Sequence, residues 1–151
     1  MIGIVLIAHR PLASALASSA AHVYGCAPEI ATSQLAVLDV VPGVDLQVTL
    51  AEARLRVDSV DSGHGVLVLT DALGATPGNV AAQLAEAGRV AVVAGVNLPM
   101  LLRTLCYRGD SLADGVDKAL AGGVQGVVRV DPSPNPQNRS PANDQSRLHH
   151  Q

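Results

Sequence analysis

The N-terminal stretch from Ile2 to Ala8 constrains the fold of this 151-residue chain more than any other feature. It contains no charged residue, and isoleucines lie on both sides of Val5. Such a run is typical of a strand buried on both faces of a parallel sheet, because an edge strand would alternate polar and apolar residues. The run ends abruptly at His9. A histidine just past the carboxyl end of a buried strand lies where open α/β sheets hold their reactive groups.

The rest of the chain alternates between apolar runs of strand length and stretches in which apolar residues recur at helical spacing. This order is typical of parallel strands joined by right-handed helical crossovers. We therefore predict a doubly wound, mostly parallel α/β sheet with helices on both faces. Strands are expected over 2–8, 34–41, 66–70, 90–94 and 126–130, and helices over 12–24, from 45, after 76, from 97 to about 108 and from about 111.

Helical spacing also predicts which faces are buried. In the helix that begins at Asp45, one stripe is apolar and the charged residues between its members are expected to face water. The expected inward stripe is Val44, Val48, Ala51 and Leu55, and the expected outward residues are Glu52, Arg54 and Arg56. In the last helix, the residues expected to point inward are Leu112, Val116, Ala119 and Leu120.

Composition narrows the class of protein. The chain is 48% hydrophobic with two Tyr, no Phe and no Trp, and its net charge is -3. We expect no nucleic-acid partner, because the chain offers neither stacking platforms nor a basic surface. The N-terminal apolar run lacks a basic leader and is too short to span a membrane, so a cytoplasmic protein is expected. Cys26 and Cys106 belong to no CxxC motif and are expected to be buried thiols rather than a disulfide.

The chain is long enough for one domain with a full core and too short for two ordinary ones. We expect that domain to cover residues 1–130. Beyond Asp131 the composition changes to Pro, Asn and Gln, which cannot support a core. Residues 131–151 are therefore predicted to be a disordered Pro/Asn/Gln-rich tail.

Two polar residues, His9 and Asp71, each follow a predicted buried strand. If those strands are parallel neighbours, their carboxyl ends open onto one crevice. A carboxylate beside an imidazole accepts the proton of one ring nitrogen and leaves the lone pair of the other nitrogen free to attack. A neutral imidazole of this kind can take up a phosphoryl group as a covalent intermediate. The sequence therefore predicts that His9 is a nucleophile and that Asp71 orients it.

The segment after Asp71 supplies candidate phosphate-binding residues. Thr76 is expected to cap a helix and Pro77 to occupy its first position, which would direct free backbone amides and the helix dipole at a phosphoryl group. Gly74 would let the backbone approach closely and adopt a positive φ. Thr70 and Arg10 are further candidates for contacts with phosphate oxygens.

Each of these residues also has a purely structural interpretation. A histidine after a strand is most often a polar residue whose ring only completes local hydrogen bonds. Asp71 could simply cap a turn, and residues 74–79 could form an ordinary strand-to-helix loop. Neither GxGxxG nor GxxxxGK[ST] occurs at a strand end, so nothing supports a nucleotide site. We predict no cofactor and no metal.

Four segments, in this order and spacing, resemble a known family. They are IVLIAHR at the first strand, VVPGVD after the second, VLVLTDALGATPGN at the third and AGVNLPMLLRTL after the fourth. Over residues 1–130 the chain resembles the mannose-family IIA domain of the bacterial phosphoenolpyruvate-dependent sugar phosphotransferase system. The resemblance implies a sheet whose last strand is antiparallel and is usually exchanged across a homodimer.

The same resemblance implies a function in sugar uptake and phosphorylation. His9 would match the phosphorylated histidine and Asp71 the acid that orients it. The phosphocarrier protein HPr would donate the phosphoryl group, and a separate IIB protein would accept it, because no IIB-like portion follows in this sequence. The protein would be peripheral to a membrane permease at most.

The chain departs from the family pattern at two places. Arg10–Pro11 stands where the family commonly has a small residue after the histidine, and Ala75 replaces the second Gly of the usual GG[ST]P. Two alternatives stay open. One is a regulatory phosphoprotein whose His9 phosphorylation controls partner binding without sugar transport, and the other is the phosphoryl-donor subunit of a dihydroxyacetone kinase. A structural or small-molecule-binding module would leave the placement of His9 and Asp71 unexplained.

Overall fold

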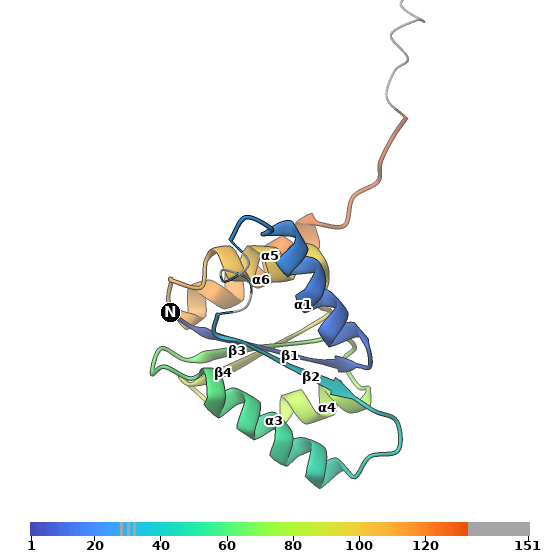
Figure 1. Cartoon of the computed structure of the whole chain (residues 1–151), viewed down its shortest axis with the longest axis vertical. Coiled ribbons are helices and arrows are strands. Elements are labelled where there is room, and N and C mark those ends of the chain that lie inside the picture. Colours follow the sequence, from blue (N-terminus) through green and yellow to red (C-terminus); the bar gives the residue numbers. More distant parts are fainter. Residues whose placement is uncertain (28, 30, 32, 133–151) are drawn as a thin grey trace, which may run out of the picture.

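The computed structural model of the chain describes residues 1–27, 29, 31 and 33–132. Strands and helices alternate along it until β4 (Val90–Ala94), which is followed by two successive helices (Figure 1). The elements are β1 (Gly3–His9), α1 (Leu12–Val23), β2 (Leu35–Val40), α3 (Leu46–Val60), β3 (Val66–Thr70), α4 (Thr76–Ala82), β4 (Val90–Ala94), α5 (Leu98–Cys106) and α6 (Leu112–Gln125). The loop predicted between α1 and β2 contains Pro28, which lies outside the described residues.

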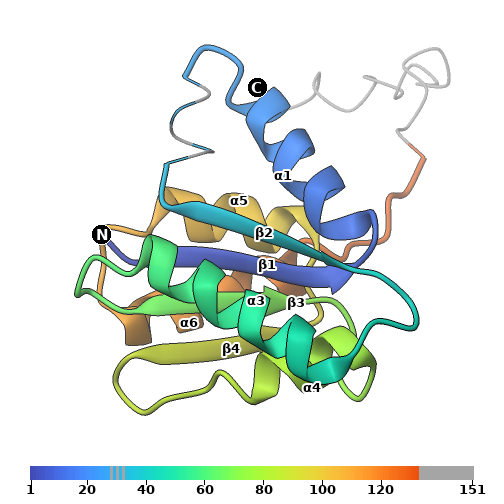
Figure 2. The same cartoon turned by 60° about the horizontal axis from the view of Figure 1, so that its bottom comes forward.

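The described strands form one sheet in the order β2-β1-β3-β4, and every pair is parallel. The doubly wound α/β fold predicted from the sequence is therefore confirmed. β1 lies between β2 and β3, with Ile7 opposite Thr70 and His9 opposite Val40. Because these strands are parallel, the carboxyl ends of β1, β2 and β3 lie at the same end of the sheet. Figure 2 shows this end of the sheet beside α4.

Helices cover both faces of the sheet. Ile4 and Leu6 of β1 pack into a core with α1, α5 and α6, whereas Val5 and Ile7 pack into a second core with α3 and α4. All four side chains are fully buried. Burying an aliphatic side chain of this size contributes about 1.5–3 kcal/mol, so β1 anchors both cores. This confirms the prediction that β1 is buried on both faces.

Side-chain caps fix where three helices begin. The Asp45 carboxylate accepts hydrogen bonds from two first-turn amides of α3, at 2.8 and 3.1 Å. Asn97 caps α5 through one such bond at 2.9 Å, and Pro99 follows in the first turn as predicted. Ser111 caps α6 at 3.2 Å. Each cap satisfies an amide that has no partner within the helix.

The predicted last strand does not form. Residues 127–130 have no regular structure, and within the described chain the sheet contains parallel pairs throughout, so the expected antiparallel last strand is not supported. The end of α6 packs against α5 and directs the following residues away from the sheet. A Cβ at Gly126 would lie 2.4 Å from the Pro99 ring, so the last turn of α6 presses against α5. The chain therefore leaves from the helical layer, not from the sheet edge (Figure 1).

The predicted inward face of α3 was also wrong. Val44, just before the helix, and Val48 and Leu55 within it are 44, 55 and 65% exposed, and Ala51 is exposed too. The buried residues are Thr49, Leu50, Ala53, Val57 and Val60. Residues around α3 thus form two apolar stripes, and the sequence pattern alone did not show which one meets the sheet.

One smaller expectation fails because α6 packs against α5 through two glycines. Gly122 and Gly123 of α6 approach Arg103 and Met100 of α5 so closely that a Cβ would lie within 2.7 Å of them. That contact turns Leu120 outward, where it is 47% exposed.

Both thiols are exposed and free, rather than buried as expected. Cys106 is the last residue of α5, and Cys26 lies beyond the end of α1. Of the helices in the described ranges, none is long and apolar enough to cross a membrane.

Candidate active site

His9 and Asp71 meet at the carboxyl edge of the sheet. His9 is the last residue of β1, and Asp71 directly follows β3. The His9 ring nitrogen Nδ1 lies 2.6 Å from the Asp71 oxygen Oδ2, and the His9 backbone amide donates to the same oxygen at 2.9 Å. The Ala72 amide donates to the other oxygen, Oδ1, at 2.8 Å. The carboxylate is thereby held in one orientation by donors from the end of β1 and from the loop that follows β3.

This geometry selects one form of the histidine. Burial raises the pKa of the Asp71 carboxyl, but the hydrogen bonds from His9 and Ala72 outweigh that effect and hold the pKa below its usual range. The ionised carboxylate only accepts hydrogen bonds, so Nδ1 carries the proton in the neutral ring. The lone pair is then on Nε2. The His9 side chain is 53% exposed and that of Asp71 only 12%, so the ring is the accessible member of the pair.

A cleft of about 610 Å³ opens beside the histidine. One wall comes from the end of β2 and the loop that leads into α3, and the other comes from α4. The lining residues are His9, Val40, Val41, Pro42, Gly43, Val44, Leu46, Thr76 and Asn79. Most of this lining is apolar, and polar groups are confined to His9 and the α4 side.

Thr76 lies in the same cleft as His9, but it does not cap α4. Ala75 occupies the cap position, Thr76 is the first helical residue, and Pro77 comes second. The helix begins one residue earlier than the sequence indicated because Ala75 already has an extended backbone. Among the described residues, no side chain forms a capping hydrogen bond at the start of α4.

The remaining sequence-predicted residues surround the pair at different depths. Gly74 is exposed and adopts φ = 86°, the positive value that glycine was expected to allow. Arg10 is exposed beside the histidine, and its amide donates to the Val40 carbonyl at 3.1 Å. Thr70 is 1% exposed, and its Oγ1 has no hydrogen-bond partner among the described residues.

Sequence reasoning missed the apolar wall of the cleft and Asn79. Asn79 lines the cleft and donates from Nδ2 to the Gly74 carbonyl at 3.4 Å, which ties α4 to the loop before it. A signal for the wall was present, because the segment from Val41 to Val44 follows β2. Loops that follow parallel strands all meet at this edge of the sheet.

The fold and the site together define a doubly wound α/β protein with a carboxylate-oriented histidine beside a cleft at the strand ends. The family model described as EIIA-man, PTS system fructose IIA component, matches residues 3–120. The chain therefore belongs to the mannose/fructose-type IIA components of the phosphotransferase system, which are phosphotransferases. The family resemblance inferred from the four sequence segments is confirmed.

Individual relatives agree with this assignment. The mannose-specific EIIAB component of Escherichia coli is 33% identical over 100 residues, which is 64% of this chain and 31% of that relative. The fructose-specific EIIA component of Bacillus subtilis is 31% identical over 109 residues, covering 72% of this chain and 71% of that relative. The chain thus spans about a third of the first relative and most of the second.

Solved structures share the fold. An EIIA component from Streptococcus agalactiae superimposes with a TM-score of 0.73 at 26% identity, covering 85% of this chain and 97% of that one. A mannose/sorbose-specific IIA subunit from Enterococcus faecalis gives a TM-score of 0.75 at 23% identity, covering 89% of this chain and 98% of that one.

Proposed function

We propose that His9 accepts a phosphoryl group from phospho-HPr on Nε2 and passes it to a separate IIB protein, for sugar uptake and phosphorylation. In the first step the Nε2 lone pair forms a bond to phosphorus, while the bond from phosphorus to the donor breaks and its electron pair stays with the donor. In the second step the acceptor attacks phosphorus, and the N–P electron pair returns to Nε2.

The observation that carries this proposal is the 2.6 Å contact between His9 Nδ1 and Asp71 Oδ2. Phosphorylation of Nε2 places positive charge on a ring whose Nδ1 keeps its proton. An adjacent anion stabilises that charge, and a fixed ring orientation lowers the entropy loss on reaching the transition state. The partly exposed ring gives a protein donor access to Nε2.

Four residues are proposed to bind the phosphoryl oxygens. Thr76 shares the cleft with His9 and can donate its hydroxyl, and Gly74 allows the preceding loop to approach the phosphate closely. Arg10 supplies positive charge beside the histidine. Thr70 would contribute the buried hydroxyl that has no partner among the described residues. Donors already in place near developing negative charge are effective because little reorganisation is needed.

The proposed partners are HPr as donor, a IIB protein as acceptor, and a second copy of this chain in a homodimer. The mostly apolar cleft beside a half-exposed histidine suits a protein partner, because interface centres are apolar and their rims polar. We propose no nucleic-acid partner and a cytoplasmic relay, with at most peripheral contact to a membrane permease. The relatives are a mannose-specific and a fructose-specific component, which favours sugar uptake over a kinase-donor role for this chain.

The test is phosphorylation in a reconstituted relay. The full chain is incubated with phosphoenolpyruvate, enzyme I and HPr, and acid-labile phosphate on the protein is measured. We expect stoichiometric incorporation that is absent in His9→Ala. His22→Ala is the matched control, because His22 is exposed on α1 and does not line the cleft, and it should be phosphorylated like the wild type. Incorporation that persists in His9→Ala would refute the proposal.

A further inference from the structure

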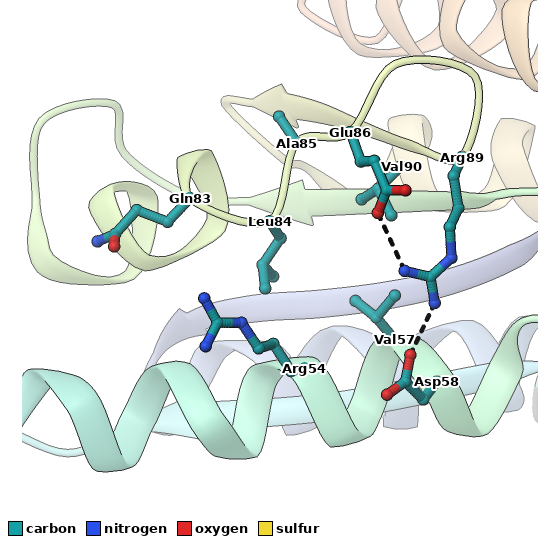
Figure 3. A pocket seen from close by; sticks show the side chains of 9 residues that line it. All are labelled: Arg54, Val57, Asp58, Gln83, Leu84, Ala85, Glu86, Arg89 and Val90. Carbon is teal, nitrogen blue, oxygen red and sulfur yellow. Dashed lines mark hydrogen bonds and ion pairs between the residues drawn. The ribbon is translucent and has the colours of Figure 1, made fainter.

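A second cleft, of about 320 Å³, lies between α3 and the connection from α4 to β4 (Figure 3). It shares no lining residue with the cleft at His9, although α3 contributes to both. Its apolar base is formed by Val57, Leu84 and Val90, which are 3, 8 and 4% exposed. Its charged residues stand at the rim. Cofactor and ligand sites combine an apolar lining with a few placed polar groups in this way.

Arg89 fixes one end of the rim. Its guanidinium donates to Asp61 at 2.9 Å, to Asp58 Oδ1 at 2.7 Å and to Glu86 Oε2 at 3.1 Å. These hydrogen bonds raise the pKa of Arg89 above its ordinary value. The arginine therefore orients three carboxylates, of which those of Asp58 and Glu86 line the cleft, rather than serving as a free cation. The second oxygens, Asp58 Oδ2 and Glu86 Oε1, make no hydrogen bond in the described part of the protein.

Arg54 lies at the opposite end of the cleft. Figure 3 shows its guanidinium on the far side of Leu84 from the cluster of Arg89, Glu86 and Asp58. Arg54 forms no ion pair with any residue that the structure describes, and its side chain is exposed. The rim thus presents a cation at one end and two carboxylate oxygens at the other, with aliphatic side chains between them.

We propose that this cleft binds a small zwitterion of the α-amino acid class with an aliphatic side chain. The ligand carboxylate would pair with Arg54, and its ammonium group would donate to Asp58 and Glu86. The aliphatic part would lie on Leu84 and Val57. The cleft volume is at the lower end of the range for small-molecule sites, which suits a ligand of this size. The proposal does not depend on the phosphorylation of His9.

The charge arrangement sets the expected selectivity. A monoanion would gain the contact with Arg54 but would lie near two carboxylates. A monocation would gain the contacts with Asp58 and Glu86 but would lie near Arg54. Only a molecule that carries both charges satisfies both ends, so loss of either charge removes attraction and adds repulsion.

The experiment is a titration of the uniformly ¹⁵N-labelled full chain, followed by amide chemical shifts. The probes are L-leucine, 4-methylpentanoate, which lacks the ammonium group, and 3-methylbutylamine, which lacks the carboxylate. We expect L-leucine to shift amides of 54–58 and 83–90 in a saturable way. Each analogue should bind at least about tenfold more weakly, as expected for loss of a charge-assisted contact.

Two variants complete the test. Arg54→Gln should weaken L-leucine binding by about tenfold or more while the rest of the spectrum shows an intact fold. Arg56→Gln is the matched control on the same helix, because Arg56 donates instead to the Val37 carbonyl at 3.1 Å, and it should bind L-leucine like the wild type. The proposal is overturned by the absence of saturable shifts, by equal binding of either analogue, or by unchanged binding in Arg54→Gln.

Discussion

One oxygen of Asp71 accepts two hydrogen bonds from the same residue, the His9 amide at 2.9 Å and the His9 ring at 2.6 Å. The backbone bond sets where the carboxylate lies, and the ring bond sets how the imidazole is turned. Because His9 is the last residue of β1 and Asp71 directly follows the adjacent parallel strand β3, the arrangement is built into the sheet. A substitution at Asp71 should therefore affect the ring more than the fold.

Asp71→Asn should slow phosphorylation of His9 by about 10²- to 10⁴-fold, because the neutral amide removes the anion and no longer enforces the Nδ1–H tautomer. The initial rate with phospho-HPr is the measurement, and circular dichroism checks that the fold is intact. Asp117→Asn, an exposed change on α6, is the control and should leave the rate unaltered. An unaltered rate in Asp71→Asn would contradict the orienting role.

The same carboxyl should give the protein a specific acid sensitivity. The pKa of Asp71 lies below its ordinary value of 3.8, so the unfolded chain takes up this proton at a higher pH than the folded protein does. The stability that the Asp71 carboxylate contributes is therefore fully present above pH 3.8. It is lost as the pH falls through the pKa that Asp71 has in the folded protein.

Urea unfolding of the wild type and Asp71→Asn across that pH range measures this contribution. The difference between their unfolding free energies should shrink as the pH is lowered. Comparing the two variants cancels the contribution of Asp61, whose pKa is lowered in both by the Gly63 amide and Arg89. A difference that stays constant with pH would mean that the carboxyl is not stabilised in its charged form.

Thr70→Val removes the buried Thr70 hydroxyl and tests whether that group serves the fold or the phosphoryl group. Thr70 Oγ1 has no partner among the described residues, so replacing it with an isosteric methyl should raise the unfolding free energy by about 1 kcal/mol. If Thr70 holds the phosphoryl group as proposed, phospho-His9 should also hydrolyse faster in this variant. An unchanged hydrolysis rate would remove Thr70 from the phosphate-binding set.

Gly3→Ala should destabilise the fold by about 1–3 kcal/mol, since a Cβ there would lie 2.4 Å from the Val60 carbonyl oxygen. This contact is where the end of α3 packs on β1. Chemical denaturation measures the loss. Gly109→Ala, where a Cβ would meet nothing within 4 Å, is the control and should change stability little. Equal stabilities for the two variants would show that α3 can shift away from the sheet without cost.

The sequence was most informative where one physical requirement dominates. β1 was predictable because only a strand buried on both faces tolerates so long a run without charge. The Asn97 cap was predictable because capping is a local interaction. The meeting of His9 and Asp71 followed from parallel topology, since the carboxyl ends of neighbouring strands share an edge.

The failures involve choices that local pattern does not determine. Around α3 two apolar stripes compete, and the choice between them depends on long-range contacts such as that between Gly3 and Val60. The apolar run at 127–130 has strand composition but no strand pairs with it in the described chain. The second cleft could not be found from the sequence. Arg54 and Glu86 line the same cleft only because α3 packs against the α4–β4 connection.

The most direct test of the central claim is nitrogen-detected NMR of the phosphorylated protein with ¹⁵N-labelled histidine. We predict that phosphorus is coupled to Nε2 of His9 and that Nδ1 of the same ring keeps its proton, bonded to Asp71. Phosphate on Nδ1 of His9, or on any other residue, would contradict the account.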